Sequence, residues 1–272
     1  MTGAVPLGWL ALLTAAGLVV VSAALLRAWR VGNELDFVWG AVRTVAQLLA
    51  VGFVLRWIFD AAAVIWVGLA FAVMLSAASV TASRRVEVPG LLGISALSLA
   101  IGSGLTTLAV TALVVRADPW WAPRYFLPLA GMIVGNAMNA AALAADRLHA
   151  EMRARRDLIE ELLALGATPR QAGAGAVRAA LRAALLPTVN AMLTVGLVSL
   201  PGMMTGQMVA GADPEAAARY QIVVMFMLTS ATTVSAMILA GLVRRRFFNA
   251  AWQLVIPETA ASRPPASRRR SS

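Results

Sequence analysis

Residues 146–166 read DRLHAEMRARRDLIEELLALG, and this polar stretch interrupts a chain that is otherwise a series of apolar runs. A bilayer core needs about 20 apolar residues per helix. Seven runs qualify, five before the polar stretch and two after it, at roughly 5–26, 37–58, 62–81, 91–115, 124–145, 184–208 and 218–243. We therefore predict an all-α polytopic membrane protein with seven transmembrane helices.

The composition supports this class and excludes several kinds of chemistry. Of the 272 residues, 60% are hydrophobic and 13% are charged, which is too apolar for a soluble domain of this size. The chain has no cysteine and one histidine, His149, so disulfides, thiolate sites and histidine clusters are excluded. No nucleophile, base and orienting group come together within the spans, so we expect no catalytic residue and no enzyme activity.

The basic residues predict the orientation. Arginines follow the first, third, fifth and seventh spans, whereas the loops around Asp60, Asp118 and Asp213 are short and poor in arginine. By the positive-inside rule, the N-terminus lies outside and the C-terminus in the cytoplasm, with the protein in the inner membrane. The net charge of +10 then reflects orientation, and we expect the lipid bilayer, not nucleic acid, as a partner. Residues 1–256 form the membrane domain, and the Pro-, Ser- and Arg-rich tail 257–272 is expected to be disordered.

The cytoplasmic loop 146–183 is predicted to form a helical hairpin. Leucine and isoleucine recur at helical spacing over residues 158–165. Gly166 ends the first helix, and Thr168 caps a second helix that has Pro169 at its first position. Three pairs of oppositely charged residues, four positions apart, support the first helix. They are Glu151 with Arg155, Arg153 with Asp157, and Arg156 with Glu160. The hairpin could lie on lipid or dock on a partner protein, and the pattern leaves both open.

Two polar stretches within the spans are candidates for a transport path. Residues 199–211, SLPGMMTGQMVAG, contain Pro201 and Gly202, which kink or break a helix. The break could be a plain kink, a gate at the outer mouth with Gln207 as its polar lining, or a soft-metal site from Met203, Met204 and Met208. We favour the gate and predict no metal site, because thioethers prefer ions such as Cu(I), whereas iron prefers imidazole or carboxylate.

The second stretch is GMIVGNAMNA in the fifth span. Asn136 and Asn139 are three residues apart and share one helix face, and Gly131 and Gly135 have the spacing of close helix packing. The two asparagines could form interhelical hydrogen bonds or a polar strip on the path.

A family resemblance adds to these inferences. The run EELLALGATP, residues 160–169, resembles the coupling motif of ABC-transporter permeases, in which a Gly follows a Glu by six residues, as Gly166 follows Glu160 here. With PRYFLPLAGMIVGNAMNA (123–140) and VSLPGMMTGQMVAGADPEAAARYQIVVMF (198–226), the chain resembles the FetB-type permease family along nearly its whole length. That family is linked to iron export in bacteria, with relatives in plant aluminium tolerance.

The resemblance implies a homodimeric permease that exports a metal ion such as iron and works with a separate ATP-binding subunit. The chain has no GxxxxGK[ST] loop, so ATP would be used by the partner and this chain would hold no cofactor. The residues expected to couple to the ATPase are Glu160, Glu161, Leu165, Gly166, Ala167, Thr168 and Pro169. The alternatives are a secondary carrier, which usually needs a charged group at mid-membrane, and a membrane scaffold that transports nothing.

Overall fold

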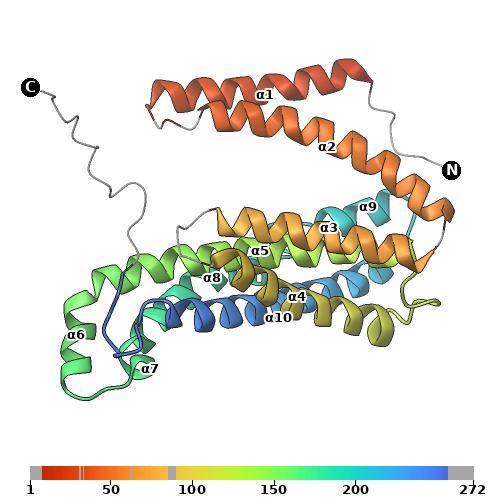
Figure 1. Cartoon of the computed structure of the whole chain (residues 1–272). Coiled ribbons are helices and arrows are strands. Elements are labelled where there is room, and N and C mark those ends of the chain that lie inside the picture. The colour runs from red at the N-terminus through yellow and green to blue at the C-terminus, as the bar shows by residue number, and fades with distance from the viewer. Residues whose placement is uncertain (1–7, 31, 33, 62, 85–89, 257–272) are drawn as a thin grey trace, which may run out of the picture.

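A computed structural model describes residues 8–30, 32, 34–61, 63–84 and 90–256, and these form an almost entirely helical protein (Figure 1). The predicted tail 257–272 lies outside the described residues. The longer helices are α1 (Trp9–Ala28), α2 (Glu34–Ala61), α3 (Val64–Ser83), α4 (Leu91–Ala109), α5 (Pro123–Ala154), α8 (Ala174–Thr194) and α10 (Pro214–Arg245). The shorter ones are η1 (Val110–Val114), α6 (Arg156–Ala164), α7 (Pro169–Ala172) and α9 (Gly202–Val209).

Six helices of the described residues are long and apolar enough to cross a membrane. They are α1, α2, α3, α4 with its η1 extension, α5 and α10, and they correspond to six of the seven predicted spans. The remaining span, 184–208, is not one helix, because α8 ends at Thr194 and α9 begins at Gly202. The protein is thus a polytopic all-α membrane protein, and the count of seven crossings stays a prediction.

The helix is broken at 195–201, and Pro201, which is expected to kink or break it, stands at the end of this break as the N-cap of α9. The turn has Gly196 at φ +83°, and Gly196 N–H donates to the carbonyl of Ser199 at 2.9 Å. Val198 N–H donates to the carbonyl of Thr194 at 2.9 Å. The turn therefore satisfies part of its own backbone, as a non-helical segment at membrane depth requires.

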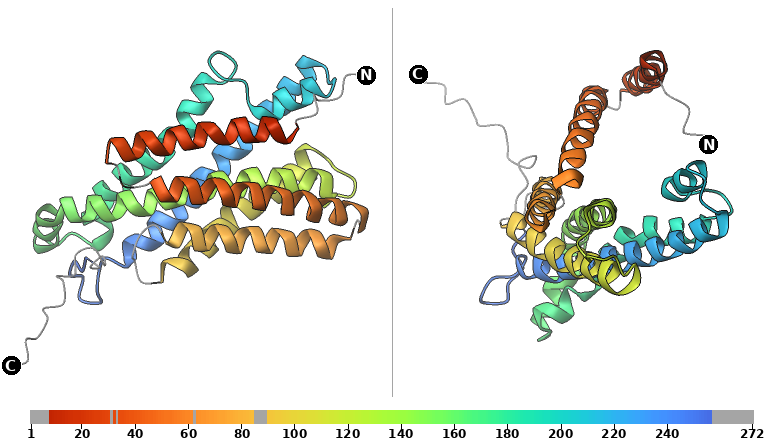
Figure 2. Two further views of the ribbon diagram at one scale, coloured as in Figure 1. Left: turned by 90° about the horizontal axis from the view of Figure 1, so that it is seen from above. Right: turned by 90° about the vertical axis from the view of Figure 1, so that its right-hand side faces the viewer.

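Together, α8 and α9 run back along the whole length of α10. A Cβ added at Gly173, just before α8, would lie 3.3 Å from Arg244 Cδ, near the end of α10. At the other end, α9 stops at Val209 and α10 begins at Pro214. The segment 174–209 is consequently antiparallel to α10 over a comparable distance (Figure 2).

Helix α5 lies at the centre of the bundle and packs against α3, α4, α8 and α10. Its buried face carries small side chains, including the fully buried Ala130, Ala137, Ala141 and Ala144. Small residues let helix backbones approach closely in membranes, where apolar burial alone does not distinguish helix from lipid. The core is therefore held by close fit along α5.

A close approach joins α4 to α10 at Gly102. A Cβ added at Gly102 would lie 2.1 Å from Ser235 Oγ and 2.8 Å from Ser235 N. Thr107 on α4 and Thr232 on α10 are also buried. Of the two glycines predicted to pack closely, Gly131 does so, because a Cβ there would lie 3.1 Å from Met74 Cε. A Cβ at Gly135, or at Gly104 on α4, would meet no atom of the described residues within 4 Å.

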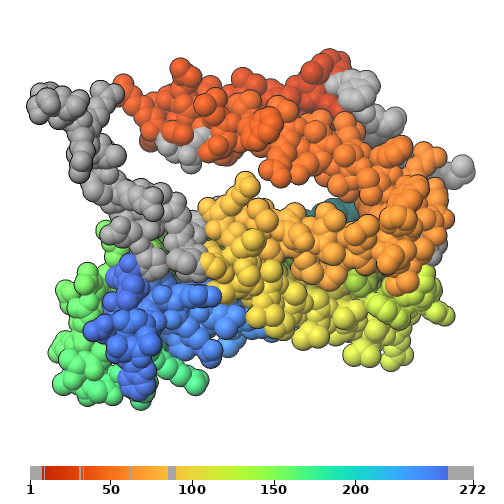
Figure 3. Space-filling view, viewed as in Figure 1, coloured from red at the N-terminus to blue at the C-terminus, as the bar shows by residue number. Residues whose placement is uncertain are grey.

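Helices α1 and α2 form a separate pair that stands off from the bundle (Figure 1). The pair is anchored at the end of α2, where Ile58 is buried against Val67 of α3 and Phe126 of α5. A hollow of 1080 Å³ opens between α2 and α3 and is lined in part by Arg43 and Arg84 (Figure 3).

Candidate functional site

The turn between α6 and α7 is the best-defined feature of the predicted coupling segment. Gly166 has φ +89°, and its N–H donates to the carbonyl of Leu163 at 3.0 Å. The N–H of Ala167 donates to the carbonyl of Leu162 at 2.9 Å. This is the Schellman arrangement that places glycine after a helix end, as the sequence predicts.

Thr168 begins α7 through a capping box. The N–H of Gln171 donates to Thr168 Oγ1 at 3.3 Å, and the N–H of Thr168 donates to Gln171 Oε1 at 2.9 Å. Pro169 occupies the first helical position, where its missing N–H costs nothing. The turn is therefore fixed from both sides by backbone and side-chain hydrogen bonds.

Thr168→Ala should cost about 1 kcal/mol of local stability, because the substitution removes the cap while the chain keeps Pro169 and Gly166. We expect faster hydrogen exchange at the amides of residues 170–173, measured by mass spectrometry in detergent. The matched control is Thr14→Ala, whose Oγ1 donates only to the carbonyl of Ala11 within α1. Unchanged exchange in Thr168→Ala would show that the cap does not hold the turn.

The helix leading into this turn differs from the prediction. Helix α5 continues to Ala154 and breaks at Arg155, which has φ −105° and ψ 21°, so the expected single helix over 146–166 is two helices. The ion pairs Arg155–Glu151 at 2.7 Å and Arg156–Glu160 at 2.8 Å both form. The predicted pair of Arg153 with Asp157 spans the break and is not formed among the described residues.

The side chains of α6 face in two directions. Ile159 is buried against the bundle, whereas Leu165 at the tip of the turn is 78% exposed. Glu160 is exposed, and its hydrogen bond with the Arg156 guanidinium raises the pKa of Arg156. An exposed leucine beside a fixed ion pair is suited to contact with another molecule.

The C-terminal loop lies beside this turn, which the sequence analysis did not anticipate. Residues Ala251–Val255 and the turn residues Glu160, Gly166 and Ala167 line a shared pocket of 570 Å³. Asn249 Oδ1 accepts from the N–H groups of Ala251 and Gln253 at 3.0 and 2.9 Å and so fixes the loop. No sequence signal predicts that the loop after α10 lies beside Glu160, because its position depends on how α10 ends.

A cavity of 220 Å³ lies between α5, α8 and α10. Asn136 and Asn139 line it from α5, as the shared helix face predicts, and Thr188 lines it from α8. Asn136 Nδ2 donates to the carbonyl of Met132 on its own helix at 2.9 Å, not to a neighbouring helix. This contact favours the polar-strip interpretation over an interhelical hydrogen bond for Asn136.

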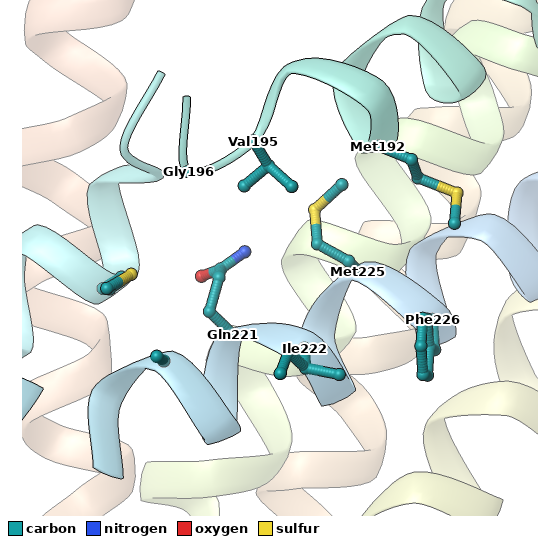
Figure 4. Close-up of a pocket in the computed structure, with 9 residues that line it drawn as sticks. Met192, Val195, Gly196, Gln221, Ile222, Met225 and Phe226 are labelled. Atoms are coloured by element: carbon teal, nitrogen blue, oxygen red, sulfur yellow. The ribbon is translucent and has the colours of Figure 1, made fainter. Parts of the chain in front are cut away.

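A second cavity of 390 Å³ adjoins the first and lies between α8, α9 and α10. Met192, Met204 and Met225 line it, one from each of these helices. Figure 4 shows Gln221 and Met225 projecting from α10 toward Val195 and Gly196 of the α8–α9 turn. Met225 lines both cavities.

The structure separates the methionines that the sequence grouped together. Met204 lines the second cavity, whereas Met203 packs into a buried cluster with Ile133 and Val224. Pro201 caps α9, Gly202 begins it and Gln207 lies along it, and none of the three lines either cavity. Their role as a gate stays a prediction.

Three residues of this region escaped the sequence analysis, namely Met192, Gln221 and Met225. Gln221 and Met225 are four residues apart and share one face of α10, a signal that could have been found from spacing alone. Met192 joins them only through the fold. Among the described residues, no group of three or more histidine, cysteine, aspartate or glutamate side chains could hold a metal ion.

Comparison with known proteins identifies the chain's relatives. A model of the "Uncharacterised protein family (UPF0014)" matches residues 9–248. A UPF0014 membrane protein of Synechocystis is 39% identical over 92% of this chain and 95% of its own length. The probable iron export permease protein FetB of Escherichia coli is 40% identical over 89% of this chain and 92% of its own. The protein ALUMINUM SENSITIVE 3 of Arabidopsis thaliana is 39% identical over 88% of each chain. No solved structure matches.

Proposed function

The chain belongs to the UPF0014 family of membrane proteins, and we propose that it is the permease subunit of an ABC transporter that exports a metal ion such as iron. A separate ATP-binding subunit would supply the energy, and two copies of this chain would form the membrane part. The name of the Escherichia coli relative supports the cargo class and direction.

One observation carries the proposal beyond that name. The segment α6–turn–α7 joins α5 to α8, and these two helices line the cavity with Asn136, Asn139 and Thr188. A displacement of the turn by an ATPase would therefore act directly on two walls of the cavity. In this mechanism, ATP binding moves the turn, and the cavity changes its access from the inside to the outside.

The same arrangement supports the proposed membrane topology. Because α8 and α9 together run antiparallel to α10, we assign them as the sixth of seven crossings in chain order, interrupted by the turn at 195–201. The N-terminus then lies outside, and the α6–α7 turn and the C-terminal loop share the cytoplasmic side. That placement agrees with the pocket that these two segments form together.

The test is the ATPase activity of a complex with a genomically adjacent ATP-binding subunit, if one is encoded there. Wild type is compared with a double variant, Glu160→Ala with Gly166→Leu. Leucine at φ +89° costs about 1–2 kcal/mol and deforms the turn, so we expect loss of the complex or of cargo-stimulated hydrolysis.

The matched control is Gly211→Leu with Glu215→Ala at the opposite end of α10. Gly211 also has a positive φ, +94°, and Glu215 also pairs with an arginine, Arg219, within its helix. We expect this control to keep the complex and most of its hydrolysis. Transport that persists in ATP-free vesicles, without any complex, would refute the proposal and favour a secondary carrier.

A further inference from the structure

We propose that the cavity between α8, α9 and α10 is a binding site for a soft monovalent metal cation, of the class of Cu(I) and Ag(I). Met192, Met204 and Met225 would supply thioether sulfurs, and Gln221 would supply an amide oxygen. The inference rests on the proposed function, because it names the cargo class that this chain's own residues fit.

The first argument is that the methionines of the cavity come from different helices. The three methionines come from three different helices and line one cavity of 390 Å³. Methionines scattered through a core would fill gaps individually, as Met203 does in its buried cluster. Thioether sulfur is a soft ligand, which selects Cu(I) among the common biological metals.

The second argument is the unpaired amide of Gln221. This side chain is 6% exposed, and its Oε1 has no hydrogen-bond partner among the described residues. A buried amide without a partner costs about 1–3 kcal/mol, so an otherwise apolar cavity is a costly place for it. Figure 4 shows the Gln221 amide projecting from α10 into the space below the turn at Val195 and Gly196, with its nitrogen on the side of Val195 and its oxygen on the opposite side. A cation in the cavity would give the oxygen the partner that it lacks.

The third argument concerns charge. The residues that line the cavity are all uncharged, so no fixed charge would offset that of a bound ion. The Born cost of such burial rises with the square of the charge, so a divalent ion is penalised about four times as heavily as a monovalent one. This cavity therefore disfavours Fe²⁺ and Zn²⁺ and favours a monovalent ion.

The position of Met192 is held by a neighbouring hydroxyl group. Thr229 Oγ1 lies 3.0 Å from Met192 Sδ and 2.9 Å from the carbonyl oxygen of Met225. The Thr229 side chain thus contacts both Met192 on α8 and the backbone of Met225 on α10, the residues that carry two of the three sulfur atoms. Met225 also lines the adjoining cavity with Asn136 and Asn139, so an ion released there would meet amide oxygens next.

The test is Ag(I) titration of the purified full chain in lipid nanodiscs, measured by calorimetry and by metal content after desalting. We expect the wild-type chain to bind one Ag(I) ion. In Met204→Leu and in Met225→Leu, this ion should be lost or bound at least about tenfold more weakly. Leucine is close to methionine in volume, so both variants should fold. Met203→Leu, the neighbour whose side chain packs into the core, should bind Ag(I) as wild type does.

One further variant and a second ion keep the result decisive. Gln221→Leu should weaken Ag(I) binding even if a methionine variant fails to fold, and anaerobic Fe²⁺ should bind at least tenfold more weakly than Ag(I). Equal Ag(I) binding by wild type and all cavity variants, or tighter binding of Fe²⁺, would overturn the assignment. If the ATPase complex forms and is coupled while Ag(I) does not bind, only this inference fails. If Ag(I) binds but no ATPase complex forms, the proposed function fails instead.

Discussion

Gly102→Ala should destabilise the protein by about 1–3 kcal/mol, although alanine usually stabilises a helix relative to glycine. The new Cβ would lie 2.1 Å from Ser235 Oγ and 2.8 Å from the backbone nitrogen of the same residue. The hydroxyl can rotate away, but the backbone of α10 can move only if the whole helix shifts. We expect a fall of several degrees in the temperature at which half of the detergent-solubilised protein stays monodisperse.

The matched control is Gly104→Ala on the same helix. A Cβ at Gly104 meets no atom within 4 Å, so this variant should be as stable as wild type or slightly more stable. Adding Ser235→Ala to Gly102→Ala should recover only part of the loss, because the contact with the backbone nitrogen remains. Equal stability of the two glycine variants would mean that α4 and α10 are further apart than described.

Thr188→Trp should abolish transport without preventing assembly with the ATPase. Thr188 lines the cavity of 220 Å³ from α8, and an indole in its place would fill most of the space between α5, α8 and α10. We expect export from loaded vesicles to fall about tenfold or more, while the complex and its basal hydrolysis persist. Metal release from reconstituted vesicles measures the first quantity, and phosphate release measures the second.

The control for this substitution is Val189→Trp, one residue further along α8. Val189 is 46% exposed and does not line the cavity, so the same indole there faces away from the space between the helices. We expect export to stay near the wild-type rate. Loss of export in both variants would show that the effect is on α8 as a whole and not on the cavity.

Six spans could be predicted, because the length of an apolar run is itself set by the bilayer. Five agree with the helices to within a few residues at both ends, whereas α5 continues past the predicted end at 145 to Ala154. The exception is 184–208, where hydropathy measures composition but not backbone conformation. Residues 195–201 are as apolar as a helix, yet Gly196 at φ +83° and the hydrogen bond to Ser199 turn the chain. The break at Arg155 escaped prediction for a similar reason, since the residues around it all favour helix.

The candidate site could be predicted only where its signals are local in sequence. Gly166, Thr168 and Pro169 mark the turn because helix ends need particular residues within a few positions. Asn136 and Asn139 share a face because of helical spacing alone. Met192 and Met204, by contrast, lie on either side of the turn, and only the fold brings them to one cavity.

The contact between Gly102 and Ser235 has a consequence for biosynthesis. It joins α4 to α10, the last helix among the described residues, and η1 and the five helices α5 to α9 are made between them. During that interval the surface of α4 around Gly102 has no α10 to pack against it. A nascent chain that is stopped before residue 214 should therefore be less stable in the membrane than the full chain. The synthesis of α10 then completes the packing of the membrane domain.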